Sequence, residues 1–231
     1  MGLVVSALPA CATGSQGTDD DDDAAGGGGT STAATTGGGG TGGTGGTGGT
    51  GGGGLTGSGG VRVPAVGEVI FIELMPDPDQ LSDDDAEFFE LKNLSNATLD
   101  LQGCLLTDDG SSGDEVTISD PVLIDPGQIL IFAKSSNPAV NGNLPSVAFA
   151  FGANYTLANG GDEAMLECGG LLIDQVAYTS DWPYATGASM QLSLSQQTAT
   201  GNDSSASWCT ATATYAAGNL GTPGTDTGHC P

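Results

Sequence analysis

The sequence predicts an all-β domain, either an antiparallel sandwich or a barrel, that follows a long N-terminal tether. After residue 64, short runs rich in Val, Ile, Leu and Phe are separated by Gly, Pro, Asn and Asp turn signals, and none has the apolar period of a helix. Before that point, residues 24–60 contain 21 glycines among 37 residues, with mostly Thr, Ser and Ala beside them. Such a segment cannot bury enough apolar surface to offset chain entropy, so we expect a disordered linker.

The expected strands are short, and turn signals separate them. The run 66–75 ends at Pro76-Asp77-Pro78-Asp79, because proline cannot donate to a β-ladder. The runs 163–168 and 171–179 are expected to form a hairpin across Gly169-Gly170. The other expected strands are 87–93, 97–107, 116–119, 128–133, 147–151 and 189–194, followed by an irregular tail up to Pro231. The rings expected in the core are Phe71, Phe88 or Phe89, Phe132, Phe149 and Trp208.

The first eleven residues are typical of the end of an export signal, an apolar run that closes with small residues before a cysteine. Leu8-Pro9-Ala10-Cys11 resembles the lipobox of bacterial lipoproteins, in which Cys11 would carry the lipid. The apolar run is short and no Lys or Arg precedes it, so the true start is expected upstream of Met1. The alternative is an ordinary signal peptide with an incidental cysteine, which would make the protein secreted.

These observations divide the chain into a lipoprotein signal (1–11), a disordered Asp- and Gly/Thr-rich linker (12–63) and a β-sandwich domain (64–231). No later stretch approaches 18 consecutive apolar residues, so a lipid anchor would be the only membrane attachment and no spanning helix is expected. The expected location is the outer membrane or cell surface of a Gram-negative-type bacterium.

The chain is strongly acidic, with 28 Asp and Glu against 3 Lys and Arg and a net charge of −25. This charge excludes nucleic acid as an expected partner, because phosphate backbones require a basic surface. The plain interpretation is solubility. The functional interpretation is binding of a divalent cation or of a cationic partner.

One acidic cluster has the residue types of a calcium site, since Ca²⁺ prefers six to eight oxygen ligands. Its spacing lacks the glycine and terminal glutamate of an EF-hand loop, and the alternative is a solvated loop. Paired carboxylates for glycoside hydrolysis and a serine–histidine arrangement using His229 are both weak, so no catalytic residue is expected. The candidate calcium ligands are Asp77, Asp79, Asp83, Asp84, Asp85 and Glu87.

The order of motifs after residue 66 resembles the lamin tail domain, an immunoglobulin-like β-sandwich found in nuclear lamins and in secreted bacterial proteins. Glu87-Phe88-Phe89-Glu90-Leu91-Lys92-Asn93 is similar to the second strand of that family and is its most recognisable motif here. The other similar motifs, in family order, are 72–74 with Asp77-Pro78, 99–103, Pro126-Gly127, 157–162, 173–178, 187–192, Trp208 and 221–224.

Four cysteines in an exported domain indicate two disulfides. None of them forms a Cys-x-x-Cys pair and His229 is the single histidine, which argues against a zinc site. The resemblance implies that Cys104 replaces a core tryptophan, and this favours pairing it with Cys168, which leaves Cys209 with Cys230. The other two pairings stay open.

The resemblance implies an adhesion, scaffolding or interaction module without catalytic residues of its own. We therefore expect a non-enzymatic envelope lipoprotein that contacts a protein or an envelope component of unknown identity, with no cofactor. One alternative is an adhesive module stabilised by Ca²⁺, and another is a secreted hydrolase.

Overall fold

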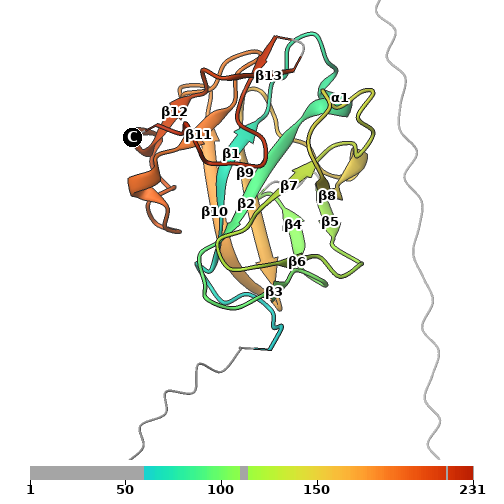
Figure 1. The fold of residues 1–231 in the computed structure, drawn as a ribbon, viewed down its shortest axis with the longest axis vertical. Helices are drawn as coiled ribbons and strands as arrows, with labels where there is room; N and C mark the ends of the chain where they lie inside the picture. Colours follow the sequence, from blue (N-terminus) through green and yellow to red (C-terminus); the bar gives the residue numbers. More distant parts are fainter. Residues whose placement is uncertain (1–59, 110–113, 217, 231) are drawn as a thin grey trace, which may run out of the picture. The chain divides into compact units, whose positions relative to one another are not determined.

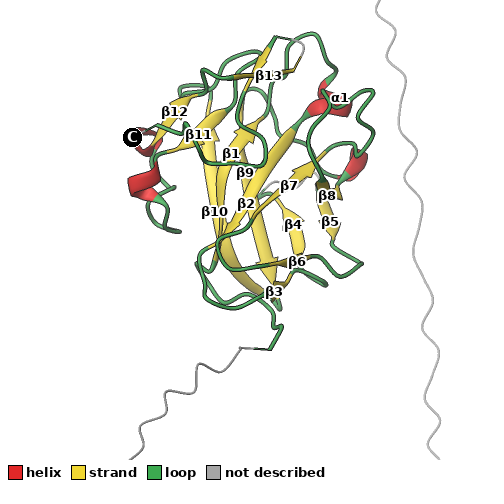
Figure 2. Cartoon of the chain, viewed as in Figure 1, coloured by secondary structure: helices red, strands yellow, loops and turns green. Residues whose placement is uncertain are grey.

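The computed structural model describes residues 60–231 apart from 110–113, 217 and 231. Two β-sheets pack against each other (Figures 1 and 2), as the sequence predicts. The larger sheet is antiparallel except for one parallel pair at its edge, between the fifth and sixth strands. Its strands, in spatial order, are β12 (Trp208–Thr210), β11 (Met190–Leu192), β1 (Val69–Met75), β2 (Phe88–Asn93), β7 (Ile129–Ala133) and β8 (Val147–Ala150).

The smaller sheet is antiparallel throughout, with the order β10 (Leu171–Thr179), β9 (Gly161–Cys168), β4 (Leu105–Thr107) and β5 (Glu115–Thr117). Two short antiparallel pairs and four short helical turns complete the described residues. The pairs are β3 (Leu99–Asp100) with β6 (Leu123–Ile124) and β13 (Thr214–Ala216) with β14 (Asn219–Leu220). The turns are α1 (Asp83–Ala86), η1 (Gly152–Asn154), η2 (Leu194–Gln196) and η3 (Ser205–Ser207).

The core between the sheets is built around the ring of Phe89. It stacks on Phe132 and Phe151 at centroid distances of 5.4 and 5.5 Å, and Phe71 lies 5.2 Å away. Of the rings expected in the core, Phe71, Phe88, Phe89, Phe132 and Trp208 are buried, whereas Phe149 is only partly buried.

The outer face of the larger sheet is also covered, which the sequence does not predict. Side chains alternate along β2, so Phe88 and Glu90 point away from the core that Phe89 enters. Phe88 belongs to a second apolar cluster with Met75 and Ile131, and Tyr215 packs on its ring at 5.7 Å. Figure 1 shows the C-terminal segment, in red, crossing the front of this sheet. All seven residues of β1 are therefore buried.

Two expectations about strands are wrong. The run 97–107 is not one strand, because a turn at Gly103 (φ +79°) separates β3 from β4, which pair with different partners. The tail after residue 194 is not wholly irregular, since it contains β12, β13 and β14. At the other end, ordered pairing begins with a bridge from Arg62 to Leu99, two residues before the expected start of the domain. Across the described residues, no helix has the length and apolar character needed to cross a membrane.

Candidate functional site

The six acids expected as calcium ligands do not converge on one point. Asp83, Asp84 and Asp85 form the first turn of α1, and the N-cap Ser82 accepts a hydrogen bond from the Asp84 amide. Acids are favoured there by the partial positive charge of a helix N-terminus. Within the described residues, the one group of three potential ligands whose atoms lie within 4.8 Å of one another is elsewhere. Asp77 accepts from Thr186, Asp79 from Gln80 and Asp83 from Asn159, while Glu87 is buried.

The contacts of Glu87 are those of a residue that stabilises the fold. Its Oε2 accepts from the amide of Leu157 at 3.1 Å and lies 3.5 Å from Lys134 Nζ. Burial raises the pKa of Glu87 to about 7. The ammonium of Lys134 is buried too, and it also donates to the carbonyl of Tyr155 and to Thr156 Oγ1. This pair links the residue before β2 to the residue after β7 and to the segment before β9, and both side chains are buried.

All three cationic side chains of the protein are held in internal ion pairs. Arg62 donates to Glu68 through its two terminal nitrogens, Nη1 and Nη2, at 2.5 and 2.6 Å. Lys92 binds Asp226, and Lys134 approaches Glu87. With 28 acids in the chain, these three pairs leave most carboxylates without a cationic partner. The surface is therefore anionic.

Carboxylates gather at one end of the smaller sheet, where β4 ends, β5 begins and β9 begins. Burial and the carboxylates of Asp108 and Asp114 raise the pKa of Asp162. Burial together with Asp162, Asp109 and Asp108 raises the pKa of Glu163. We call these five residues the acidic end. Their mutual repulsion means that a cationic partner would be stabilising there.

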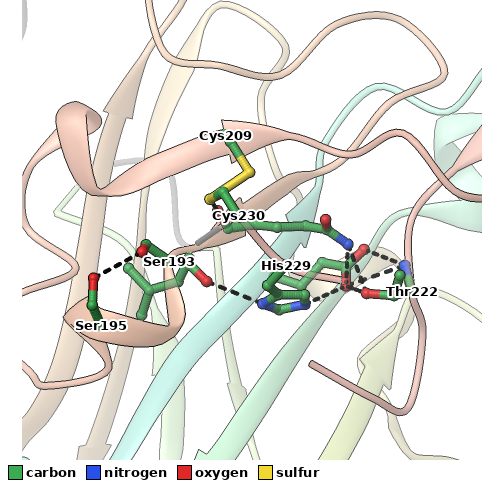
Figure 3. The surroundings of a disulfide bond; sticks show 9 residues. Ser193, Ser195, Cys209, Thr222, His229 and Cys230 are labelled. Atoms are coloured by element: carbon green, nitrogen blue, oxygen red, sulfur yellow. Dashed lines mark hydrogen bonds and ion pairs between the residues drawn. A yellow bond between two sulfur atoms is a disulfide. The ribbon is translucent and has the colours of Figure 1, made fainter. Parts of the chain in front are cut away.

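The structure contains both disulfides of the favoured pairing. Cys104 directly precedes β4 and Cys168 ends β9, and these strands are neighbours, with Leu105 opposite Glu167. The bond between Cys209 in β12 and Cys230 ties the tail to the edge of the larger sheet (Figure 3). Cys11, the candidate lipidation residue, lies outside the described residues.

The group with metal-binding residue types consists of Glu73 and Glu90 on the larger sheet and His229 in the C-terminal segment, and all three are buried. The β-ladder shifts between Phe71 and Glu73, so Ile72 is the extra residue of a bulge and Glu73 lies directly opposite Glu90. Burial and the Glu73 carboxylate hold the pKa of Glu90 well above its ordinary range. Both acids have 0% exposure, so no substrate reaches them as a hydrolytic pair.

Sequence reasoning missed this group. The sequence does contain a sign of Glu73 and Glu90, because each is an acid inside a largely apolar strand. No sequence pattern indicates His229, because its position depends on how the tail folds back over the sheet, with Cys230 bonded to Cys209. The absence of Cys-x-x-Cys pairs and the single histidine say nothing about two glutamates that the fold buries beside that histidine.

Two packed, mostly antiparallel sheets with a shared aromatic core define the class as an immunoglobulin-like β-sandwich. The sequence model of the Lamin Tail Domain family matches residues 62–180, which is 119 of the 231 residues. The chain therefore belongs to the lamin tail domain family. No curated protein matches it. Glu73 and Glu90 lie within the matched range, whereas His229 lies beyond it.

Proposed function

We propose that this protein is a non-enzymatic interaction module whose anionic β-sandwich binds a cationic surface of a protein or of another envelope component. A lipid on Cys11 would hold the module at the outer membrane or cell surface of a Gram-negative-type bacterium, through residues 12–63. The observation that carries the proposal is the charge distribution, because every Lys and Arg is engaged in an internal ion pair.

Two further observations support it. The chain belongs to a family of non-catalytic β-sandwich domains. The acidic end places five carboxylates at one end of the smaller sheet, where burial and like charges raise the pKa values of Asp162 and Glu163. Electrostatic complementarity of this kind speeds association and makes it dependent on salt.

The binding test uses the full chain with Cys11→Ala, which removes the lipid, added to washed envelope fractions of the producing cell. We expect retention that falls as NaCl rises from about 0.05 M to about 0.5 M, as screening of an electrostatic contact requires. The double substitution Asp109→Asn/Glu163→Gln at the acidic end should weaken retention. The matched control is Asp120→Asn/Asp181→Asn, which removes the same charge from other exposed positions. Salt-independent retention, or equal weakening by both variants, would contradict the proposal.

The anchor is tested separately. Metabolic labelling with a radioactive fatty acid should label the wild-type chain and leave the Cys11→Ala chain unlabelled. Equal absence of label from both would remove the anchor from the proposal.

A further inference from the structure

The outer face of the larger sheet carries two opposed, buried carboxylates that form no ion pair with a Lys or Arg. Glu73 in β1 lies directly opposite Glu90 in β2, and both have 0% exposure. Like charges directly opposite on a sheet are destabilising, and removing two carboxylates from water costs more still. The three cationic side chains of the protein pair with Glu68, Asp226 and Glu87 instead.

The two carboxylates differ in how they are hydrogen-bonded. Glu73 Oε1 accepts from Ser189 Oγ at 2.6 Å and from the Thr222 amide at 3.0 Å. Its Oε2 accepts from Thr222 Oγ1 and Gln191 Nε2. Glu90 Oε1 accepts from the amide of Gly224, but Glu90 Oε2 is buried and finds no partner among the described residues. A buried oxygen with no donor indicates a missing ligand or a proton.

The imidazole of His229 is oriented in a way that requires a cation or a second proton. Its Nδ1 lies 3.1 Å from the carbonyl oxygen of Leu192, which only accepts, so Nδ1 carries the hydrogen. In the neutral ring, Nε2 then carries a lone pair in place of a hydrogen, and this nitrogen lies 3.3 Å from Glu73 Oε2. Metal-binding histidines typically donate one N–H to a backbone carbonyl in this way while the other nitrogen binds the metal. Figure 3 shows both ring interactions beside the Cys209–Cys230 disulfide.

We propose that Glu73, Glu90 and His229 bind one divalent transition-metal cation of the zinc type. Bonds of about 2.1 Å to nitrogen and oxygen place neighbouring ligand atoms roughly 3.0–3.5 Å apart. The 3.3 Å between His229 Nε2 and Glu73 Oε2 meets this separation, and the three ligand atoms all lie within 4.8 Å of one another. A dication also neutralises the two carboxylates, and the imidazole ligand distinguishes this site from Ca²⁺ and Mg²⁺ sites, which use oxygen alone.

Residues of the C-terminal segment lie close to these carboxylates. A surface cavity of about 400 Å³ is lined by Tyr215, Gly221 and Thr222, among others, and Thr222 also donates to Glu73 through its amide and its hydroxyl. At Gly221 a side chain would meet Glu73 Oε1 at 2.7 Å, so glycine is required for the close approach of this backbone. The ion would join β1 and β2, within the family match, to the segment beyond residue 180.

The test measures metal binding to the full, oxidised chain after treatment with a chelator. Zn²⁺ and Co²⁺ are titrated in the presence of excess Ca²⁺, which occupies the exposed acids. We expect one Zn²⁺ per chain, and a Co²⁺ absorption spectrum of nitrogen and oxygen ligation. Glu90→Gln should weaken Zn²⁺ binding on the order of 100-fold, because it removes a charged ligand. Asp84→Asn, in the exposed first turn of α1, is the control and should bind as the wild type does.

The alternative without a metal is a proton on Glu90 in place of the ion. Glu90→Gln has the same shape as that protonated form and keeps an oxygen for the Gly224 amide, so the variant should fold under either interpretation. Equal Zn²⁺ affinity of Glu90→Gln and wild type, or no 1:1 binding by wild type, overturns the proposal. His229 is the only histidine, so its ¹⁵N signals in the wild-type chain give a second readout. One equivalent of Zn²⁺ should shift the Nε2 signal and leave Nδ1 protonated, and an unchanged spectrum also overturns it.

Discussion

The buried carboxyl of Asp174 predicts that the domain becomes more stable as the pH falls from 8 to 5. Asp174 Oδ2 accepts from the Phe71 amide at 2.8 Å and from Asn202 Nδ2 at 2.7 Å, while Oδ1 is buried without a partner among the described residues. Burial raises the pKa of Asp174 from 3.8 to about 8. The folded state thus binds this proton more tightly than the unfolded state. The resulting stability is fully present below about pH 4 and is lost as the pH rises through about 8.

The magnitude follows from the two pKa values. Between pH 5 and pH 8, the contribution of Asp174 to the free energy of unfolding falls by about 3–4 kcal/mol. Asp174→Asn keeps an oxygen for the Phe71 amide and is neutral at every pH. We expect the variant to match the wild type at about pH 5 and to be more stable by roughly 3 kcal/mol at about pH 8.

The assay is urea unfolding at pH 5, 6.5 and 8, with the free energy of unfolding extrapolated to water. Asp120→Asn, at an exposed position, is the control and should keep the pH dependence of the wild type. Burial also raises the pKa of Glu87 to about 7, so some pH dependence of the same sign should persist in Asp174→Asn. Identical pH dependence in Asp174→Asn and wild type would refute the reasoning.

Three further sets of substitutions test the disulfides, the buried ion pair and one glycine. Replacing Cys104 and Cys168 by alanine should lower the free energy of unfolding by about 4 kcal/mol, and replacing Cys209 and Cys230 by about 3 kcal/mol, because the first disulfide closes the longer loop. Equal losses in denaturant unfolding would contradict the loop-entropy argument. Lys134→Met should lower the free energy of unfolding by about 3–5 kcal/mol, because it leaves the Glu87 carboxylate buried without its cation. Adding Glu87→Gln should restore part of this loss, and no recovery in the double variant would argue against the pair. Gly161→Ala should lower the free energy of unfolding by about 2–4 kcal/mol, because the backbone has φ +121° and a Cβ would lie 2.9 Å from Thr179 Cα. The control is Gly160→Ala, at a position with open space around it. Equal melting temperatures of the two variants would contradict the steric argument.

Local signals in the sequence were sufficient for most of the sandwich. The apolar run of β1 stops at Pro76, and the hairpin of β9 and β10 turns at two glycines, with φ of +60° and +77°. Both features depend on residues adjacent in sequence, which is why composition and spacing predict them. The lamin-tail-like order of motifs then indicated the immunoglobulin-like arrangement that the family match confirms.

The features that escaped prediction depend on contacts between distant residues. The pattern of β2 predicts apolar residues inside and does not say whether Glu90 faces water. The structure buries Glu90 because the tail, more than 100 residues later, places the Gly224 amide on its carboxylate. The split of 97–107 has a similar cause, since β3 finds its partner in β6 rather than in the smaller sheet. The candidate metal site combines both kinds of information, with two glutamates from local strands and a histidine from a tertiary fold-back.

The scarcity of Lys and Arg, and the ion pairing of each one, also bear on cleavage of the protein by proteases. Enzymes of the trypsin type require Lys or Arg beside the bond they cleave, and residues 1–61 contain neither. The segment before the domain therefore offers no such cleavage position, whatever its conformation. Within the domain, Arg62 is in a β-bridge and bound to Glu68, Lys92 is bound to Asp226, and Lys134 is buried. The glycine-rich segment thus lacks trypsin-type cleavage positions through composition alone, and the three such positions that follow it each carry an ion pair.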